Sequence, residues 1–153
     1  MRTCVHQAVA SVHGGNGYPQ IRGTVRFRQL REGVLVTVRM SGLPIGRGDC
    51  HDRIFALHIH SGGSCTGDAA NDFSHAGAHY NPKDCPHPYH AGDLPPLFGC
   101  GDRAYCSFLT DRFCLSEVVG KVVILHHDPD DFTTQPSGNA GKMIACGVIR
   151  CTG

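Results

Sequence analysis

Apolar and polar residues alternate with a period of two through much of the first 60 residues. The pattern is clearest in residues 20–30, where Val25 and Phe27 alternate with arginines, and in residues 34–43, which end before Pro44. Side chains of a β-strand point alternately to opposite faces. Each segment is therefore expected to bury one face in a core and to expose the other.

Further segments of the same kind follow, separated by turn residues that include many of the 20 glycines and 9 prolines. Segment 112–120 is ambiguous between a short strand and a helical turn, and segments 61–102 and 128–141 are polar and long enough to be functional loops. The chain is predicted to form one all-β domain over residues 1–153, an eight-stranded Greek-key barrel or sandwich of immunoglobulin-like type. The expected strands are 4–14, 20–30, 34–43, 53–60, 104–110, 121–127 and 142–151.

The charge balance and the apolar runs limit what the chain can bind and where it resides. The net charge is +1 and there is no Lys/Arg-rich run, so the sequence predicts no nucleic-acid partner. No apolar stretch reaches membrane-spanning length, and the first 15 residues lack the apolar region of a signal peptide. A cytoplasmic protein without a membrane partner is expected. Nine cysteines favour an oxidising compartment, so a secreted or periplasmic location stays open.

Histidines gather in a pattern that is typical of metal ligands. His58 and His60 are two residues apart in an expected strand, so both rings share one face, and His126 ends a different strand. Residues 79–93 hold three more histidines in a Pro-rich loop that closes with Asp93. Two surface histidines would explain the first pair alone. The combination favours a metal site, because imidazole suits copper and zinc and a carboxylate completes a zinc site.

Several short motifs resemble the copper/zinc superoxide dismutase family. They are "FALHIH", "AGAHYNP", "HAGDLPPL", "VILHHDPDD", "GNAG" and "ACGVI", and together with "GTVRF" they span most of the chain. The resemblance implies an enzyme that converts superoxide into O₂ and hydrogen peroxide with copper and zinc as cofactors. It leaves the oligomeric state open, a homodimer among the options.

The same resemblance implies a role for individual residues. His79 would bridge the two metals and act in catalysis with His126, and Asp130 would link a copper-ligand histidine to a zinc-ligand histidine. A disulfide would join Cys65 to Cys146. The implied copper ligands are His58, His60, His79 and His126, and the implied zinc ligands are His79, His87, His90 and Asp93.

The sequence departs from the family pattern at three places. Met143 stands where the family has an anion-docking arginine, and segment 127–141 has no Lys or Arg before Lys142. The spacer between His87 and His90 is only two residues long. A slower dismutase is therefore expected. The alternative is a non-enzymatic copper/zinc-binding protein, a buffer or a delivery protein on the same barrel.

The remaining histidines and cysteines receive no firm role from the sequence. His75 and His127 lie close to implied ligands, and whether they join the site stays open. Cys4 and Cys151 fall on the first and last expected strands, which would let them pair. No role is predicted for Cys50, Cys85, Cys100, Cys106 and Cys114, and His6, His13 and His51 are expected to face solvent.

Overall fold

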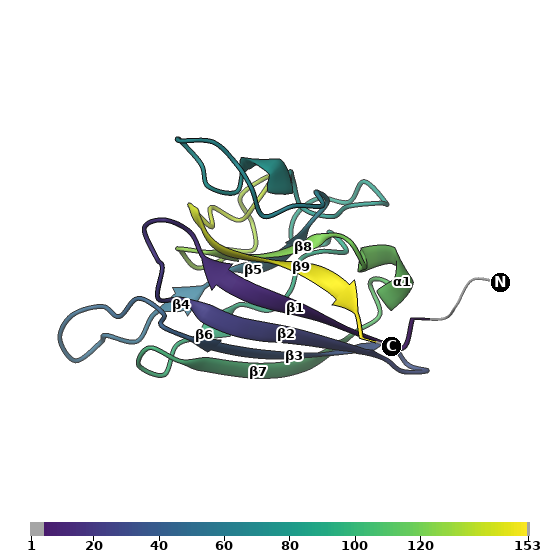
Figure 1. The fold of residues 1–153 in the computed structure, drawn as a ribbon, viewed down its shortest axis with the longest axis horizontal. Helices are drawn as coiled ribbons and strands as arrows, with labels where there is room; N and C mark the ends of the chain where they lie inside the picture. Colours follow the sequence, from purple (N-terminus) through teal and green to yellow (C-terminus); the bar gives the residue numbers. More distant parts are fainter. Residues whose placement is uncertain (1–4, 153) are drawn as a thin grey trace.

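The computed structural model describes residues 5–152, and most strands in that range form one antiparallel sheet. The sheet has the order β5-β8-β9-β1-β2-β3-β7, and a separate pair joins β4 to β6 (Figure 1). The all-β class is confirmed. The strands are β1 (Gln7–Gly14), β2 (Arg22–Gln29), β3 (Val34–Ser41), β4 (Ile54–Phe55), β5 (Leu57–His60), β6 (Leu97–Phe98), β7 (Ala104–Thr110), β8 (Val122–His126) and β9 (Met143–Cys151).

The core is built by the inward side chains of the strands that the alternation predicted. Val25 and Phe27 of β2 are buried, and so are Val36 and Val38 of β3, which pair with them across the ladder. The sheet curls around this core, as the twist of adjacent strands requires. One face of each of these strands is therefore apolar and enclosed, and the other faces solvent.

The predicted strand 53–60 is divided at Ala56 into β4 and β5. The Ala56 N–H donates to the carbonyl of Asp128 (2.9 Å), and the Ala56 carbonyl accepts from the His126 N–H (2.9 Å). β4 instead pairs with β6, a two-residue strand within the segment that was expected to be a loop. The structure also settles segment 112–120, which contains a single helical turn, α1 (Leu115–Val118).

Two long connections pack together on one side of the curled sheet, drawn at the top of Figure 1. The first, residues 61–96, contains a short 3₁₀ turn, η1 (Ser74–Ala76), and the second covers residues 127–142. A disulfide joins Cys65 of the first connection to Cys146 of β9, with 5.7 Å between the Cα atoms. The predicted disulfide is thus confirmed, and it fixes the first connection to the barrel wall.

Cys4 lies outside the described residues, so its possible disulfide with Cys151 stays a prediction. Across residues 5–152, none of the helical segments has the length and apolar character needed to span a bilayer.

Candidate metal centre

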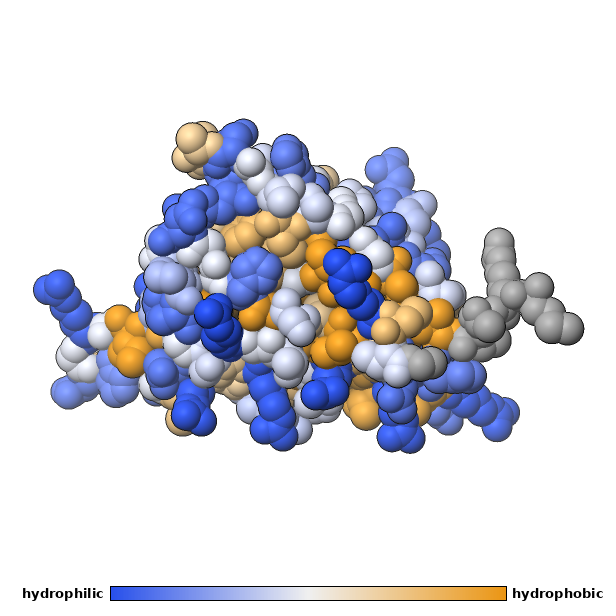
Figure 2. Space-filling view, viewed as in Figure 1, coloured by the Kyte–Doolittle hydropathy of each residue, from blue (hydrophilic) through white to orange (hydrophobic). Residues whose placement is uncertain are grey.

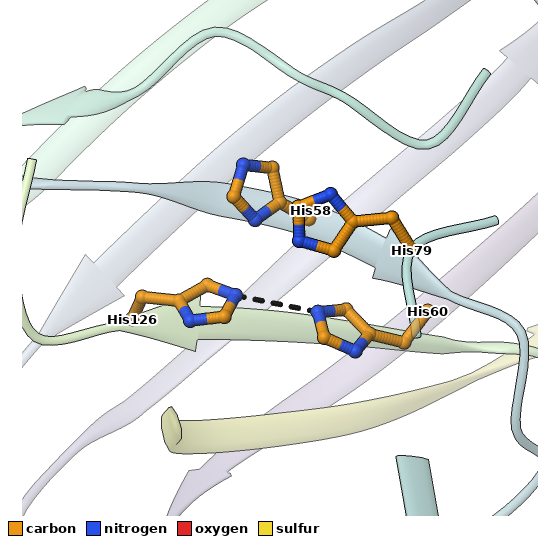
Figure 3. Close-up of side chains that lie close together, drawn as sticks. All are labelled: His58, His60, His79 and His126. Carbon is orange, nitrogen blue, oxygen red and sulfur yellow. Dashed lines mark hydrogen bonds between the residues drawn. The ribbon is translucent and has the colours of Figure 1, made fainter. Parts of the chain in front are cut away.

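Four histidine rings from three parts of the chain converge beneath the long connections. His58 and His60 come from β5, His126 ends β8, and His79 lies in the first connection, where it forms a bridge with His60. All four rings are buried, and their nitrogens face one another in Figure 3. One ligand nitrogen from each ring lies within 4.8 Å of those of the other three.

The contact between His60 Nε2 and His126 Nε2 cannot be a simple hydrogen bond. His60 Nδ1 lies 2.7 Å from the carbonyl oxygen of Gly77, and His126 Nδ1 lies 3.3 Å from that of Gly141. A carbonyl only accepts, so each Nδ1 carries the proton and each Nε2 of the neutral ring presents a lone pair. These two Nε2 atoms are 3.3 Å apart, the dashed contact of Figure 3. Two lone pairs aimed at each other suit a shared cation.

Asp130 fixes the proton position of two further rings. His58 Nε2 donates to one Asp130 oxygen (2.8 Å), and His87 Nε2 donates to the other (2.7 Å). The Nδ1 atoms of both rings are left with lone pairs, and both are buried without a hydrogen-bond partner. A carboxylate that holds ligand imidazoles in this way sets their tautomer and orientation.

A second group of donors lies on the other side of His79. His79 Nδ1 is 2.8 Å from Asp93 Oδ1 and 3.2 Å from His90 Nδ1. Asp93 Oδ2 is 3.1 Å from His87 Nδ1 and 3.2 Å from His90 Nδ1. The donor atoms of His58, His79, His87 and Asp93 also lie within 4.8 Å of one another. His58 and His79 thus occur in both groups, and His79 faces Asp93 with Nδ1 while its Nε2 is left without a partner.

Burial favours the neutral form of four of these imidazoles. It lowers the pKa of His60 to about 3 and that of His126 to about 2. Burial also lowers the pKa of His58 and His90. Burial alone would raise the pKa of Asp130, but the hydrogen bonds from His58 and His87 hold it below its usual range. Neutral imidazoles and ionised carboxylates are the forms that bind metals.

The donor sets fit copper and zinc. One group offers four imidazole nitrogens, and the other adds carboxylate oxygens, as copper and zinc sites prefer. The buried unpaired nitrogens are His58 Nδ1, His79 Nε2 and His87 Nδ1. A buried polar atom without a partner is costly, and two bound metal ions would remove that cost at these three nitrogens.

Comparisons with known proteins agree with this geometry. The family model described as "Copper/zinc superoxide dismutase (SODC)" matches residues 21–149. The chain belongs to the copper/zinc superoxide dismutase family. Copper and zinc are therefore its cofactors.

Two bacterial members show how similar the chain is to the rest of the family. It is 34% identical over 140 residues to "Superoxide dismutase [Cu-Zn]" of Legionella pneumophila, covering 86% of this chain and 80% of the relative. It is 31% identical over 160 residues to the protein of the same name from Caulobacter vibrioides, covering 94% and 85%. The structure of "Cu/Zn superoxide dismutase from Brucella abortus" superposes with a TM-score of 0.78 at 24% identity, covering 95% of this chain and all of that one, which supports the barrel fold.

The structure brings together all seven implied metal ligands and Asp130, but not His75 or His127. His75 is exposed and contacts Thr66 through Nδ1 (2.7 Å). The His127 ring turns away to Asp128 and Arg53, with 2.8 Å between His127 Nδ1 and Asp128 Oδ1. Of the histidines without a predicted site role, His6, His13 and His51 are exposed, as expected.

Two residues that hold the short ligand loop were missed by the sequence reasoning. The Gln135 side chain accepts from the His87 N–H (2.8 Å) and donates to the His87 carbonyl (2.7 Å). One guanidinium nitrogen of Arg112 donates to the carbonyls of Pro88 (2.7 Å) and His90 (3.2 Å). The hydrogen bonds of both side chains with the loop involve only its backbone atoms. The sequence of the loop therefore carries no motif that would identify them.

Gly138 was missed for a different reason. A Cβ at this position would lie 1.9 Å from Asp130 Oδ1 and 2.6 Å from His87 Nε2, and its φ is +71°. Only glycine allows the second connection to pass so close to the Asp130–His87 contact.

Met143 stands where the resemblance implies an arginine, and its surroundings are apolar. Met143 pairs with His126 in the ladder, and its half-buried side chain packs against the cluster that contains Phe73 and Cys146. The neighbouring Lys142 directs its Nζ over the ring of Tyr18, 6.0 Å from the centroid. Met143 carries no charge, and the Lys142 ammonium contacts the Tyr18 ring.

Proposed function

We propose that the chain dismutates superoxide to O₂ and hydrogen peroxide. The proposal rests on family membership and on the paired lone pairs of His60 Nε2 and His126 Nε2, 3.3 Å apart. Copper would be held by His58, His60, His79 and His126, and zinc by His79, His87, His90 and Asp93. When bound, copper supplies the one-electron oxidation and reduction, and zinc supplies positive charge without redox change.

The chain itself supplies a proton path and a fixed geometry. His79 Nε2 is buried and unpaired, so it is placed to take up a proton and pass it to the reduced substrate. Its Nδ1 is anchored between Asp93 and His90, so the ring can keep its place while the proton at Nε2 comes and goes. Asp130 holds the His58 and His87 rings in the tautomer that leaves Nδ1 free. Two superoxide ions and two protons give one O₂ and one hydrogen peroxide.

We further propose that this member is slow, because Met143 cannot attract an anion. A unit charge pair at 4 Å and an effective dielectric of 20 corresponds to about 4 kcal/mol before screening and desolvation. A quarter of that, roughly 1 kcal/mol, would raise reactivity about five-fold. Met143→Arg is therefore expected to be several-fold faster at low salt, with the gain shrinking as ionic strength rises. Met143→Gln serves as the neutral control.

The test is metal analysis of the purified protein, with a superoxide-removal assay after copper loading, on the wild type and both Met143 variants. Equal rates in wild type and Met143→Arg would contradict the slow-enzyme proposal. If all three proteins bind copper fully and none of them removes superoxide, the proposal of an enzyme is rejected. The alternative, a copper/zinc buffer or delivery protein, is then favoured. His58→Ala is expected to abolish copper-dependent turnover while circular dichroism still reports a folded barrel.

A further inference from the structure

The solvent face of the sheet carries a set of arginines that the metal centre does not use. Arg22, Arg26 and Arg28 are exposed on β2, where they alternate with buried Val25 and Phe27. Ladder pairing puts two more arginines on this face. Val9 of β1 pairs with Arg26 on one side and with Arg150 of β9 on the other, and Thr24 pairs with Arg39. Cross-strand partners share a face of the sheet.

This outer face has no negative charge of its own. The described strands β1, β2, β3, β7 and β9 contain no Asp or Glu, so every acidic residue lies in the connections or in α1. None of the ion pairs within residues 5–152 involves the five arginines. The net charge of +1 therefore conceals a separation of charge. The expectation of no nucleic-acid partner rested on that sum and on the absence of a Lys/Arg-rich run, and neither detects basic residues that strand pairing brings together.

Shallow grooves run between the arginines. A groove of about 620 Å³ is lined by Arg22, Arg39, Arg103 and Tyr105, with hydroxyls from Ser11, Thr24 and Ser41. A second groove of about 260 Å³ is lined by Arg26 and Arg28 with polar Gln7 and Thr37. Figure 2 looks onto this side, where strongly hydrophilic residues are spread over the strands, with paler polar residues and some hydrophobic residues between them.

An aromatic ring lies beside the larger groove. Tyr105 of β7 pairs with Arg39, is 61% exposed, and has the Arg39 guanidinium 4.8 Å from its ring centroid. An exposed aromatic ring within a positively charged groove is the arrangement on which single-stranded nucleic acids stack their bases.

The spacing of the arginines favours a linear chain of phosphates. At about 3.3 Å per residue and 4.8 Å per strand, Arg22 and Arg26 are roughly 13 Å apart, Arg26 and Arg28 roughly 7 Å, and Arg26 and Arg150 roughly 10 Å. One exposed charge contact is weak and screened by salt, so a small anion would gain little. A polymer that meets several guanidiniums at once adds these contacts, and guanidinium binds phosphate through two parallel hydrogen bonds.

We propose that this face, defined by Arg22, Arg26, Arg28, Arg39, Arg150 and Tyr105, binds single-stranded nucleic acid. The curl of the sheet in Figure 1 would let a planar membrane touch only its central strands, whereas a flexible chain can follow the curve. The face lies outside the ligand set of the metal centre. The proposal therefore does not depend on dismutase activity.

The first test is fluorescence anisotropy of a labelled oligothymidylate with the metal-loaded protein over a range of salt. For five phosphate contacts, log K should fall with log salt at a slope of about −3.5, since each contact to a single strand contributes about −0.7. Arg26→Gln/Arg39→Gln should reduce that slope to about −2 and weaken binding about ten-fold or more at low salt. Arg47→Gln/Lys83→Gln removes the same charge from exposed loop positions and should change affinity less than about two-fold.

A second arm separates nucleic acid from other phosphate chains. Tyr105→Ser should weaken oligothymidylate binding about five-fold or more and leave binding of inorganic polyphosphate unchanged. Equal losses in the two double variants would overturn the proposal, because the attraction would then come from net charge. The proposal would also be overturned if Tyr105→Ser bound oligothymidylate as tightly as the wild type and if inorganic polyphosphate displaced the labelled strand as well as unlabelled oligonucleotide does. Thermal unfolding of each variant checks that the barrel is intact.

Discussion

Asp130→Asn is the substitution for which the structure predicts the clearest effect on metal binding. The two Asp130 oxygens accept from His58 Nε2 at 2.8 Å and from His87 Nε2 at 2.7 Å. An amide keeps one acceptor and replaces the other with an NH₂ donor. One of the two rings must then move its proton from Nε2 to Nδ1, the nitrogen that should bind a metal.

The size of the effect follows from the lost contact. A hydrogen bond to a charged group contributes about 1.5–3 kcal/mol, which corresponds to a factor of roughly 10–150 in affinity. In other metal sites, removal of a residue that hydrogen-bonds to a metal ligand lowers metal affinity by about 10–100-fold, which is the same order of magnitude. At least one of the two metals should therefore bind about 10–100-fold more weakly.

Copper and zinc affinities of Asp130→Asn are measured separately by competition with chelators of known strength. The metal that is weakened identifies the ring that lost its carboxylate oxygen. Asp131→Asn is the matched control, because Asp131 is exposed and, within residues 5–152, its side chain accepts hydrogen bonds only from Thr133 and Thr134. If both metals bind Asp130→Asn within about two-fold of wild type, the tautomer argument is wrong.

Three further substitutions probe other parts of the centre. Asp93→Ala removes the oxygens that face three zinc-side imidazoles, so zinc content by elemental analysis should fall while copper still binds; unchanged zinc would contradict the assignment. Gly138→Ala forces a Cβ to within 1.9 Å of Asp130 Oδ1, so both metals should bind more weakly, and wild-type affinities would show that the loop adjusts freely. Cys65→Ser opens a link across 81 residues and should lower stability by about 4 kcal/mol in a denaturant titration, with no shift in midpoint as the contrary result.

The strands and the metal-ligand candidates were accessible from the sequence for a simple physical reason. Alternation marks a strand with one buried face, and Val25 and Phe27 are buried as it predicts. The ligand set was accessible only in part from spacing, since residues 79–93 are far from His126 in the sequence. The family motifs supplied the grouping that the structure now brings together.

Other features left no local signal. β6 is two residues long and is a strand only because Leu97 pairs with Phe55. The turn α1 is held by tertiary contacts, among them the bond from the Leu115 N–H to the Gln29 side chain (2.8 Å). The arginine face could not be predicted from the sequence either. It depends on which strands are neighbours in the sheet and on the absence of acidic residues from those strands.

Gln135 and Arg112 hold the ligand loop through its backbone, so these contacts do not depend on the side chain at position 89. Both hold residues 87–90 through main-chain atoms, and the intervening Tyr89 is 64% exposed and free of side-chain hydrogen bonds within the described structure. The side chain at position 89 can therefore change without loss of these anchors. A fluorescent label attached there through a cysteine would report on the ligand loop while the contacts of Gln135 and Arg112 stay in place.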